Sequence, residues 1–295
     1  MTSNPFGTVL TAMVTPMSLD GEVDEKGTDA LVDHLLETGH DGLVVNGTTG
    51  EASTLTDDES IAMVQRVKER AAGRAAVVAG VGSNDTRHAV AMARRAAEVG
   101  ADALLLVSPY YNKPTQAGLV AHCHAVADAT ELPVMLYDIP GRTGIPFTHD
   151  TLVTLADHPR IVAVKDAKGD LAASTKAIAA TDLLWFSGED ALTLPLLAIG
   201  ASGTVSVVGH VAGAQYRAMV EAVARGDLAE ARRINEALLP VVDAIMSPSQ
   251  GAIMAKAALV ELGVIESAFV RLPLLESPPA HLDALRSALA TLPTR

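Results

Sequence analysis

Short apolar runs alternate with longer stretches in which apolar residues recur at helical spacing. The runs are rich in Val, Leu, Ile and Ala and are too short for helices, so each predicts a buried strand. Repeated strand–helix units of this kind predict a parallel sheet with helices packed on it. The eight predicted strands are Thr8–Val14, Gly42–Val45, Ala76–Ala79, Ala103–Val107, Val134–Tyr137, Ile161–Val164, Leu184–Ser187 and Gly203–Val207.

Polar residues mark the starts of several predicted helices. Asp24, Thr56 and Asp85 stand where a side chain can accept hydrogen bonds from the first helical turn. Glycines follow several of the last turns, as is common where helices end. The clearest helices are predicted at Glu25–Glu37, Asp57–Arg70, Thr86–Val99 and Thr115–Ala129.

Eight strand–helix units predict a (β/α)8 TIM barrel of the α/β class, and the roughly 225 residues that hold them match the usual size of that fold. A doubly wound open sheet is the alternative, but its first strand would lead into a glycine-rich nucleotide-binding turn. Here the first strand leads into Thr15-Pro16-Met17. The barrel is therefore the better prediction.

The pattern changes after Gly226, where no further strand is predicted. Helical stretches separated by proline-containing breaks take its place. We therefore predict two domains, a catalytic barrel over residues 1–225 and a C-terminal helical domain over residues 226–295. The helices predicted in the second domain are Leu228–Met246, Ile253–Leu262 and Pro279–Leu289.

The composition narrows the classes of partner. The chain has 295 residues, of which 49% are hydrophobic, so a large core is feasible. Lysine and arginine number 22 against 35 aspartates and glutamates, which gives a net charge of −13. This charge argues against nucleic acid and anionic membranes as partners. An acidic substrate would need a local cation to hold it.

Cysteine and histidine give no sign of a metal site. Cys123 is the only cysteine, so an intrachain disulfide is excluded, and we expect it in the core. His122 and His124 are two apart on a predicted helix and point in different directions, so no metal is predicted. The N-terminal residues do not resemble a secretion signal, and no apolar run approaches the ~20 residues of a membrane span. These features predict a cytoplasmic protein.

Unusual residues gather where the predicted strands end. In a barrel these positions share one face, where active sites are built. Tyr137 and Lys165 come at the ends of the fifth and sixth strands. The segment Pro140–Gly144 follows the fifth strand, and Gly47–Glu51, Pro109–Pro114 and Gly188–Asp190 follow the second, fourth and seventh. This clustering predicts an active site.

Lys165 is the candidate nucleophile. It follows the apolar run Ile161–Val164, where burial makes a charged lysine costly and favours the free amine that Schiff-base chemistry requires. The alternative is a lysine that only marks the solvent end of its strand. The clustering of unusual residues favours the nucleophile. Lys168, in the turn that follows, is expected to be an ordinary exposed lysine.

The other candidates also allow simpler interpretations. The Gly47–Glu51 segment offers backbone N–H groups and two hydroxyls to a small carboxylate, or it is only a tight turn. Arg142 has the planar fork that suits a carboxylate, or it is a surface residue. Tyr110 and Tyr111 form a packing pair if they have no catalytic role.

Four motifs together resemble the dihydrodipicolinate synthase (4-hydroxy-tetrahydrodipicolinate synthase) family, within the N-acetylneuraminate lyase-like group of Schiff-base aldolases. The resemblance runs from about Gly7 to Leu275, and the combination is far more specific than any motif alone. The motifs are GTTGE (47–51), SPYYNKPTQ (108–116), LYDIPGRTG (136–144) and VKDAKGD (164–170).

The resemblance implies a lyase that condenses pyruvate with L-aspartate 4-semialdehyde in the diaminopimelate and lysine pathway. It implies an imine between pyruvate and Lys165, no separate cofactor, and a homotetramer built from two tight dimers. The family's proton relay corresponds to Tyr137, Thr48 and Tyr111, with Tyr111 lent by a neighbouring subunit. The substrate-binding positions correspond to Thr49 for the pyruvate carboxylate, Arg142 for the aldehyde substrate, and Gly188 and Val205 for the pocket wall.

Some positions depart from the family pattern. Asp138 and Gly141 stand where members often carry Asn and Ser, which we expect to matter little. The lysine-feedback pocket of enteric and plant members departs further, although Asn84 and Tyr110 are retained. His88 replaces a glutamate there, and Asp57 and Ser60 replace histidines. We therefore predict weak or absent inhibition by lysine.

Two other functions fit parts of the pattern. The first is a related pyruvate aldolase acting on a sialic acid or a 2-keto-3-deoxy sugar acid. Arg142 argues against it, because a polyhydroxylated acceptor calls for neutral hydroxyl-binding residues. The second is a catalytically silent paralogue that binds a 2-oxo acid, and the complete set of relay hydroxyls argues against it.

Overall fold

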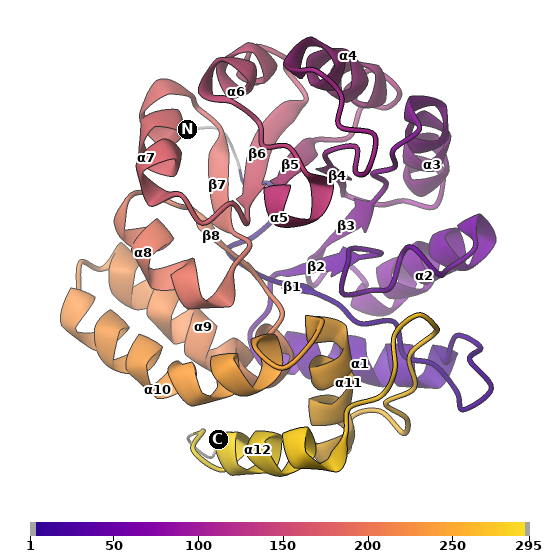
Figure 1. The fold of residues 1–295 in the computed structure, drawn as a ribbon, viewed down its shortest axis with the longest axis vertical. Helices are drawn as coiled ribbons and strands as arrows, with labels where there is room; N and C mark the ends of the chain where they lie inside the picture. The colour runs from indigo at the N-terminus through magenta and orange to yellow at the C-terminus, as the bar shows by residue number, and fades with distance from the viewer. Residues whose placement is uncertain (1–3, 293–295) are drawn as a thin grey trace.

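Eight parallel strands close into a barrel in the computed structural model, which describes residues 4–292. Each strand pairs with the next along the chain, and the last pairs with the first, so the predicted TIM barrel is confirmed (Figure 1). The strands are β1 Val9–Ala12, β2 Gly42–Val45, β3 Ala76–Gly80, β4 Ala103–Val107, β5 Val134–Asp138, β6 Ile161–Asp166, β7 Leu184–Ser187 and β8 Gly203–Ser206.

Helices surround the barrel in the order expected of βα units (Figure 1). Asp24 and Asp85 cap their helices as predicted, and Thr56 forms a capping box with Glu59. The helices of the barrel are α1 Glu25–Glu37, α2 Asp57–Ala71, α3 Thr86–Glu98, α4 Gln116–Ala127, α5 Pro140–Thr143, α6 His149–Ala156, α7 Leu171–Ala180, α8 Thr193–Ala198 and α9 Gly209–Ala224, with a 3-10 turn η1 at Asp190–Leu192.

Three further helices follow the barrel: α10 Leu228–Met246, α11 Gly251–Glu261 and α12 Pro279–Leu289. They lie outside the strands, where α10 and α11 pack against α9, and α12 packs against α10 and α11 (Figure 1). Within residues 4–292 no single helix is long and apolar enough to cross a membrane. Only α10 and α11 taken together reach that length and composition, and they are bent by 111° at their junction.

The alternation of side chains along β5 and β6 places the two central candidate residues inside the barrel. Tyr137 belongs to the interior cluster, together with Ala163 and Phe186. Lys165 pairs in register with Tyr137 on one side and with Phe186 on the other. Strand β6 continues two residues beyond its predicted end, so Lys165 lies within the strand rather than after it. Successive residues point to opposite faces.

Candidate active site

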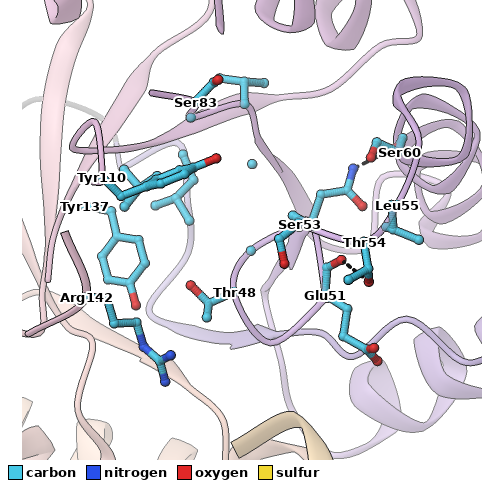
Figure 2. Close-up of a pocket in the computed structure, with 18 of the residues that line it drawn as sticks. Thr48, Glu51, Ser53, Thr54, Leu55, Ser60, Ser83, Tyr110, Tyr137 and Arg142 are labelled. Carbon is cyan, nitrogen blue, oxygen red and sulfur yellow. Dashed lines mark hydrogen bonds between the residues drawn. The ribbon is translucent and has the colours of Figure 1, made fainter. Parts of the chain in front are cut away.

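A cavity of about 570 Å³ opens at the carboxyl ends of β2 to β5. Its wall includes Thr48, Tyr110, Tyr137, Arg142 and Gln250. In Figure 2 the Thr48 hydroxyl faces the phenol end of Tyr137, and the Arg142 guanidinium extends beside that end. Thr48, Tyr110, Tyr137 and Arg142, which belong to the ends of three different strands or the loops that follow them, therefore line one cavity as their predicted clustering requires.

Lys165 lies on β6 beside Tyr137, and its side chain points into the barrel. The residue is 5% exposed, and its Nζ lies 4.1 Å from the centroid of the Tyr137 ring. Among the described residues it has no hydrogen bond and no ion pair. An amine that is buried against an aromatic face without a carboxylate partner is available for chemistry with a ligand. Lys165 and Thr49 are not among the residues that line the open cavity.

Gly188 lies against the Lys165 side chain, and neither Gly188 nor Val205 lines the cavity. A Cβ at position 188 would lie 3.0 Å from both Cγ and Cε of Lys165, so a larger residue would displace the lysine. Val205 is 1% exposed and belongs to the interior cluster with Tyr137. Gly188 therefore leaves the space that the lysine side chain occupies.

The segment Gly47–Glu51, here called the glycine turn, follows β2. Gly50 N donates to Gly47 O at 3.0 Å, and Glu51 N donates to Thr48 O at 3.2 Å. Thr15 Oγ1 donates to Gly50 O at 2.7 Å and ties the turn to the segment after β1. Thr49 is 6% exposed, whereas Thr48 lines the cavity. The two threonines therefore face different surroundings.

Arg142 is held by the short helix α5. Pro140 occupies the first turn, where its missing N–H costs nothing, and Gly144 ends the helix with a φ of 86°. Arg142 is exposed, lines the cavity, and has no ion pair among residues 4–292. Its guanidinium is free to bind an anionic ligand.

Glu189 adds a negative charge near these cations. Burial raises the pKa of Glu189, and so does the nearby Asp190, whereas Lys165 and Arg142 act in the opposite direction. Asp190 itself is fully occupied, because it accepts hydrogen bonds from Ser206 Oγ, Tyr216 and two backbone N–H groups. The loop after β7 is thereby fixed to β8 and α9.

The two adjacent tyrosines of the β4–α4 loop lie in different places. Tyr110 lines the cavity and is 39% exposed. Tyr111 is 89% exposed and has a φ of 72°, in the left-handed region. Within one chain the structure does not bring Tyr111 to Lys165 or Tyr137.

The expectation for Lys168 was wrong. Its side chain is 12% exposed, and its Nζ lies 3.5 Å from Asp138 Oδ2. Asp138 also accepts a hydrogen bond from Phe147 N at 3.3 Å. Burial raises the pKa of Asp138 to about 6, and Lys168 opposes that shift. Asp138 follows Tyr137 directly on β5. An aspartate at this position, where family members often carry an asparagine, therefore brings an ion pair with Lys168 next to the site.

The far side of the cavity holds the residues of the altered feedback pocket. His88, Asp57 and Ser60 all line it, and His88 Nε2 lies 2.9 Å from Asp57 Oδ1. Tyr110 lines the same cavity and lies near Tyr137 in Figure 2. Two of the three replacement residues, His88 and Asp57, thus contact each other, and the lysine response stays a prediction.

Two residues near the glycine turn, Lys256 and Gln250, were not predicted from the sequence. Glu51 and Lys256 form an ion pair at 2.5 Å whose side chains are 1% and 0% exposed. Gln250 Nε2 donates to Thr48 O at 3.2 Å. The sequence held one indication, because Lys256 is the single charged residue among the first ten residues of the helix Gly251–Glu261. In the part of the chain that the structure describes, no cluster of His, Cys, Asp or Glu is arranged to hold a metal ion.

Comparison with known proteins gives consistent results. The model of the "Dihydrodipicolinate synthetase family" matches residues 5–292. The chain is 54% identical to a 4-hydroxy-tetrahydrodipicolinate synthase of Kineococcus radiotolerans, covering 97% of this chain and 93% of the relative. It is 52% identical to a protein of the same name from Streptomyces coelicolor, covering 97% and 95%.

Solved structures agree with this result. A dihydrodipicolinate synthase from Bacillus anthracis has a TM-score of 0.94 at 42% identity, covering 98% of this chain and 99% of that one. One from Cyanidioschyzon merolae, solved with lysine bound, has a TM-score of 0.95 at 43% identity with the same coverage. Sequence, fold and site residues therefore lead to one conclusion: the chain belongs to the dihydrodipicolinate synthetase family.

Proposed function

We propose that the chain condenses pyruvate with L-aspartate 4-semialdehyde through an imine on Lys165. The activity is that of a 4-hydroxy-tetrahydrodipicolinate synthase, a lyase of the diaminopimelate and lysine pathway. The single observation that carries the imine is the buried Lys165 amine on the Tyr137 ring, which forms no hydrogen bond or ion pair among residues 4–292. An enclosed amine that no other group engages is available to attack the ketone carbon of a bound pyruvate.

The first half of the reaction concerns pyruvate. The Lys165 nitrogen attacks the ketone carbon, and the carbonyl oxygen leaves as water to give an imine. Loss of a methyl proton then gives the enamine, which is the carbon nucleophile. Thr49 and the backbone N–H groups of the glycine turn hold the pyruvate carboxylate. Tyr137 and Thr48 carry the protons, in keeping with the facing hydroxyls in Figure 2.

The second half concerns the aldehyde. The enamine carbon attacks the aldehyde carbon, and the aldehyde oxygen takes a proton from the relay. The amino group of the adduct then attacks the imine carbon, which closes the ring and frees Lys165. Arg142 binds the carboxylate of this substrate with its planar fork. No step needs a metal or an organic cofactor, because the imine itself withdraws the electrons.

Tyr111 completes the relay from a second copy of the chain. Its exposure of 89% leaves the side chain free to enter a neighbouring site. The assembly we propose is a homotetramer of two tight dimers. A solved monomeric dihydrodipicolinate synthase variant is 34% identical with a TM-score of 0.94, covering 97% of each chain. Native mass spectrometry of this chain distinguishes a tetramer from a monomer. A cytoplasmic location belongs to the same proposal.

Trapping the imine tests the proposal. The protein is incubated with pyruvate and borohydride, digested, and mapped by mass spectrometry. We expect one reduced pyruvate adduct, on Lys165, and none in the Lys165→Arg variant. Lys168→Arg is the matched control, because that lysine is also buried but is paired with Asp138. An adduct on any other lysine would refute the assignment.

A coupled assay tests the acceptor. The parent protein is supplied with pyruvate and either L-aspartate 4-semialdehyde or N-acetylmannosamine. We expect turnover with the first aldehyde only, because Arg142 offers a cation to its carboxylate. Turnover with the sugar alone would favour the sugar-acid aldolase.

A further inference from the structure

Helix α11 contacts both ends of the glycine turn. At the start of the helix, Gln250 Nε2 donates to the Thr48 carbonyl oxygen at 3.2 Å. Two turns further along, Lys256 Nζ lies 2.5 Å from Glu51 Oε1. One helix outside the barrel therefore fixes the backbone of Thr48 and the side chain of Glu51, the last residue of the glycine turn.

The Glu51–Lys256 ion pair is completely enclosed, with side chains 1% and 0% exposed. Taking two charges out of water is costly, and the cost is recovered only with close geometry and further hydrogen bonds. Both partners have them. Lys256 donates to Phe269 O at 2.7 Å, and Glu51 Oε2 accepts from Arg271 N at 2.9 Å. Burial lowers the pKa of Lys256, and its bond to Glu51 opposes that shift.

The backbone around the glycine turn needs this support. Asn46 and Glu51 have φ values of 58° and 56°, in the left-handed region. A non-glycine residue there costs about 1 kcal/mol or more, and the surrounding contacts must hold it. The Thr48 carbonyl accepts from both Glu51 N and Gln250 Nε2, so the turn's own hydrogen bond and the helix contact share one atom.

The directions of the side chains show which face each contact serves. In Figure 2 the Glu51 carboxylate points away from Tyr137, whereas the Thr48 hydroxyl points toward it. The buried ion pair therefore lies behind the turn and the proposed proton relay in front of it. A shift of the turn would move Thr48 relative to Tyr137, and small misplacements of reacting groups cost rate steeply.

We propose that Lys256 and Gln250, acting through Glu51 and the Thr48 carbonyl, are positioning residues that keep the Thr48 hydroxyl facing Tyr137. This inference rests on the proposed function, because it assigns the glycine turn a task in proton transfer. It makes helix α11 part of the catalytic unit rather than a passive cover of the barrel.

Two variants test the inference without leaving a charge buried alone. The double variant Glu51→Gln with Lys256→Met removes both charges and nearly keeps the volume. Gln250→Ser keeps a side chain able to cap α11 but is too short to reach the Thr48 carbonyl. The matched control is Arg286→Gln, which removes an ion pair to Glu261 at the other end of α11.

The informative measurement is exchange of the pyruvate methyl protons with D2O in the absence of aldehyde, followed by NMR. Exchange requires enamine formation and therefore reports the relay. We expect exchange and kcat to fall by between roughly tenfold and a hundredfold in both variants. The borohydride adduct should still form on Lys165, and Arg286→Gln should behave as the parent. Thermal unfolding of each variant separates loss of rate from loss of fold.

Each outcome gives a decision. Folded variants that exchange at the parent rate would overturn the inference, because the ion pair would then only attach α11 to the barrel. If the double variant does not fold, Gln250→Ser decides alone. Absence of a Lys165 adduct in the parent would refute the proposed function instead.

Discussion

Three lysines with little or no exposure lie in three different electrostatic environments. Lys168 is paired with Asp138, and Lys256 is paired with Glu51. Lys165 lies against the Tyr137 ring at 4.1 Å and has no carboxylate partner in the described part of the chain. The amines of Lys168 and Lys256 are engaged by carboxylates, whereas the Lys165 amine forms no ion pair among residues 4–292. This difference is why we propose Lys165, and not Lys168 or Lys256, as the nucleophile.

Arg142 gives a prediction at the same scale. We expect Arg142→Ala to raise the KM for L-aspartate 4-semialdehyde by about tenfold to a hundredfold. This range corresponds to the loss of one hydrogen bond to a charged group, which contributes roughly 1.5–3 kcal/mol. The KM for pyruvate should not change, because the substituted residue binds only the second substrate. Steady-state kinetics with each substrate varied in turn measure both. Arg142→Lys should lie between, since it keeps the charge but loses the fork. An unchanged aldehyde KM would remove Arg142 from the site.

His88 gives a second prediction. We expect free lysine to inhibit the parent protein weakly or not at all. His88 offers no carboxylate to the ammonium groups of the inhibitor, and its ring already contacts Asp57. A lysine titration of the initial rate measures this. The variant His88→Glu with Asp57→His should gain sensitivity. Strong inhibition of the parent at low lysine concentration would contradict the prediction.

At the scale of elements, the ends of β5 and β6 place opposite chemistries on opposite faces. Tyr137 and Lys165 pair in register inside the barrel, and Asp138 and Asp166 are the next pair along. Asp166 accepts hydrogen bonds from Trp185 Nε1 and Ser174 Oγ behind the sheet. Because side chains alternate along a strand, the same two strands present the reactive groups inward and a buried acidic pair outward.

This arrangement predicts a pH effect on stability. The pKa of Asp138 is raised by burial from 3.8 to about 6, so the folded state holds a proton that the unfolded state has lost between these pH values. The slope of stability with pH is therefore negative, and this contribution is present below pH ~4 and lost as the pH rises through ~6. Relative to Asp138→Asn, the parent should lose at most about 3 kcal/mol across that window.

Urea unfolding of the parent and of Asp138→Asn at matched pH values measures the difference between their free energies of unfolding. Groups that titrate alike in both proteins make no contribution to this difference. Lys168→Met in the Asp138→Asn background is the control, because it removes the cation that would otherwise be left without its partner. A difference that does not change with pH would show that Asp138 ionises at its ordinary pKa.

At the scale of the whole molecule, one chain does not contain every proposed group. Tyr111 is 89% exposed, has a φ of 72°, and is not among the residues that line the cavity of its own chain. The proposed relay therefore requires a second copy of the chain to supply the Tyr111 hydroxyl.

Mixing two inactive variants tests the shared site. We expect Tyr111→Phe and Lys165→Met each to be nearly inactive, and an equal mixture to recover about a quarter of the parent rate. Half of the dimers are then mixed, and each mixed dimer has one site with both groups intact. Subunit exchange is checked by native mass spectrometry. No recovery after confirmed exchange would mean that Tyr111 acts within its own chain or not at all.

The order of the elements and the face that carries the site follow from local patterns. Short apolar runs predicted every strand of the barrel, and capping residues predicted the starts of α1, α2 and α3, because both signals depend on neighbours a few residues away. The ends of the strands were predicted less accurately. Strand β6 continues through Lys165, because this residue pairs with Tyr137 on one neighbouring strand and with Phe186 on the other. The roles of the site residues and the division of the chain near Gly226 stay predictions.

The sequence by itself determined the barrel, the clustering of Thr48, Tyr137, Arg142 and Lys165, and the family that these motifs resemble. Only the tertiary structure decided which of the three enclosed lysines, Lys165, Lys168 and Lys256, lies outside any ion pair. Glu51 and Lys256 are 205 residues apart in the chain, and they meet only because the barrel closes and α11 packs against the glycine turn. Ion pairing depends on distance in space, and no pattern of neighbouring residues encodes it.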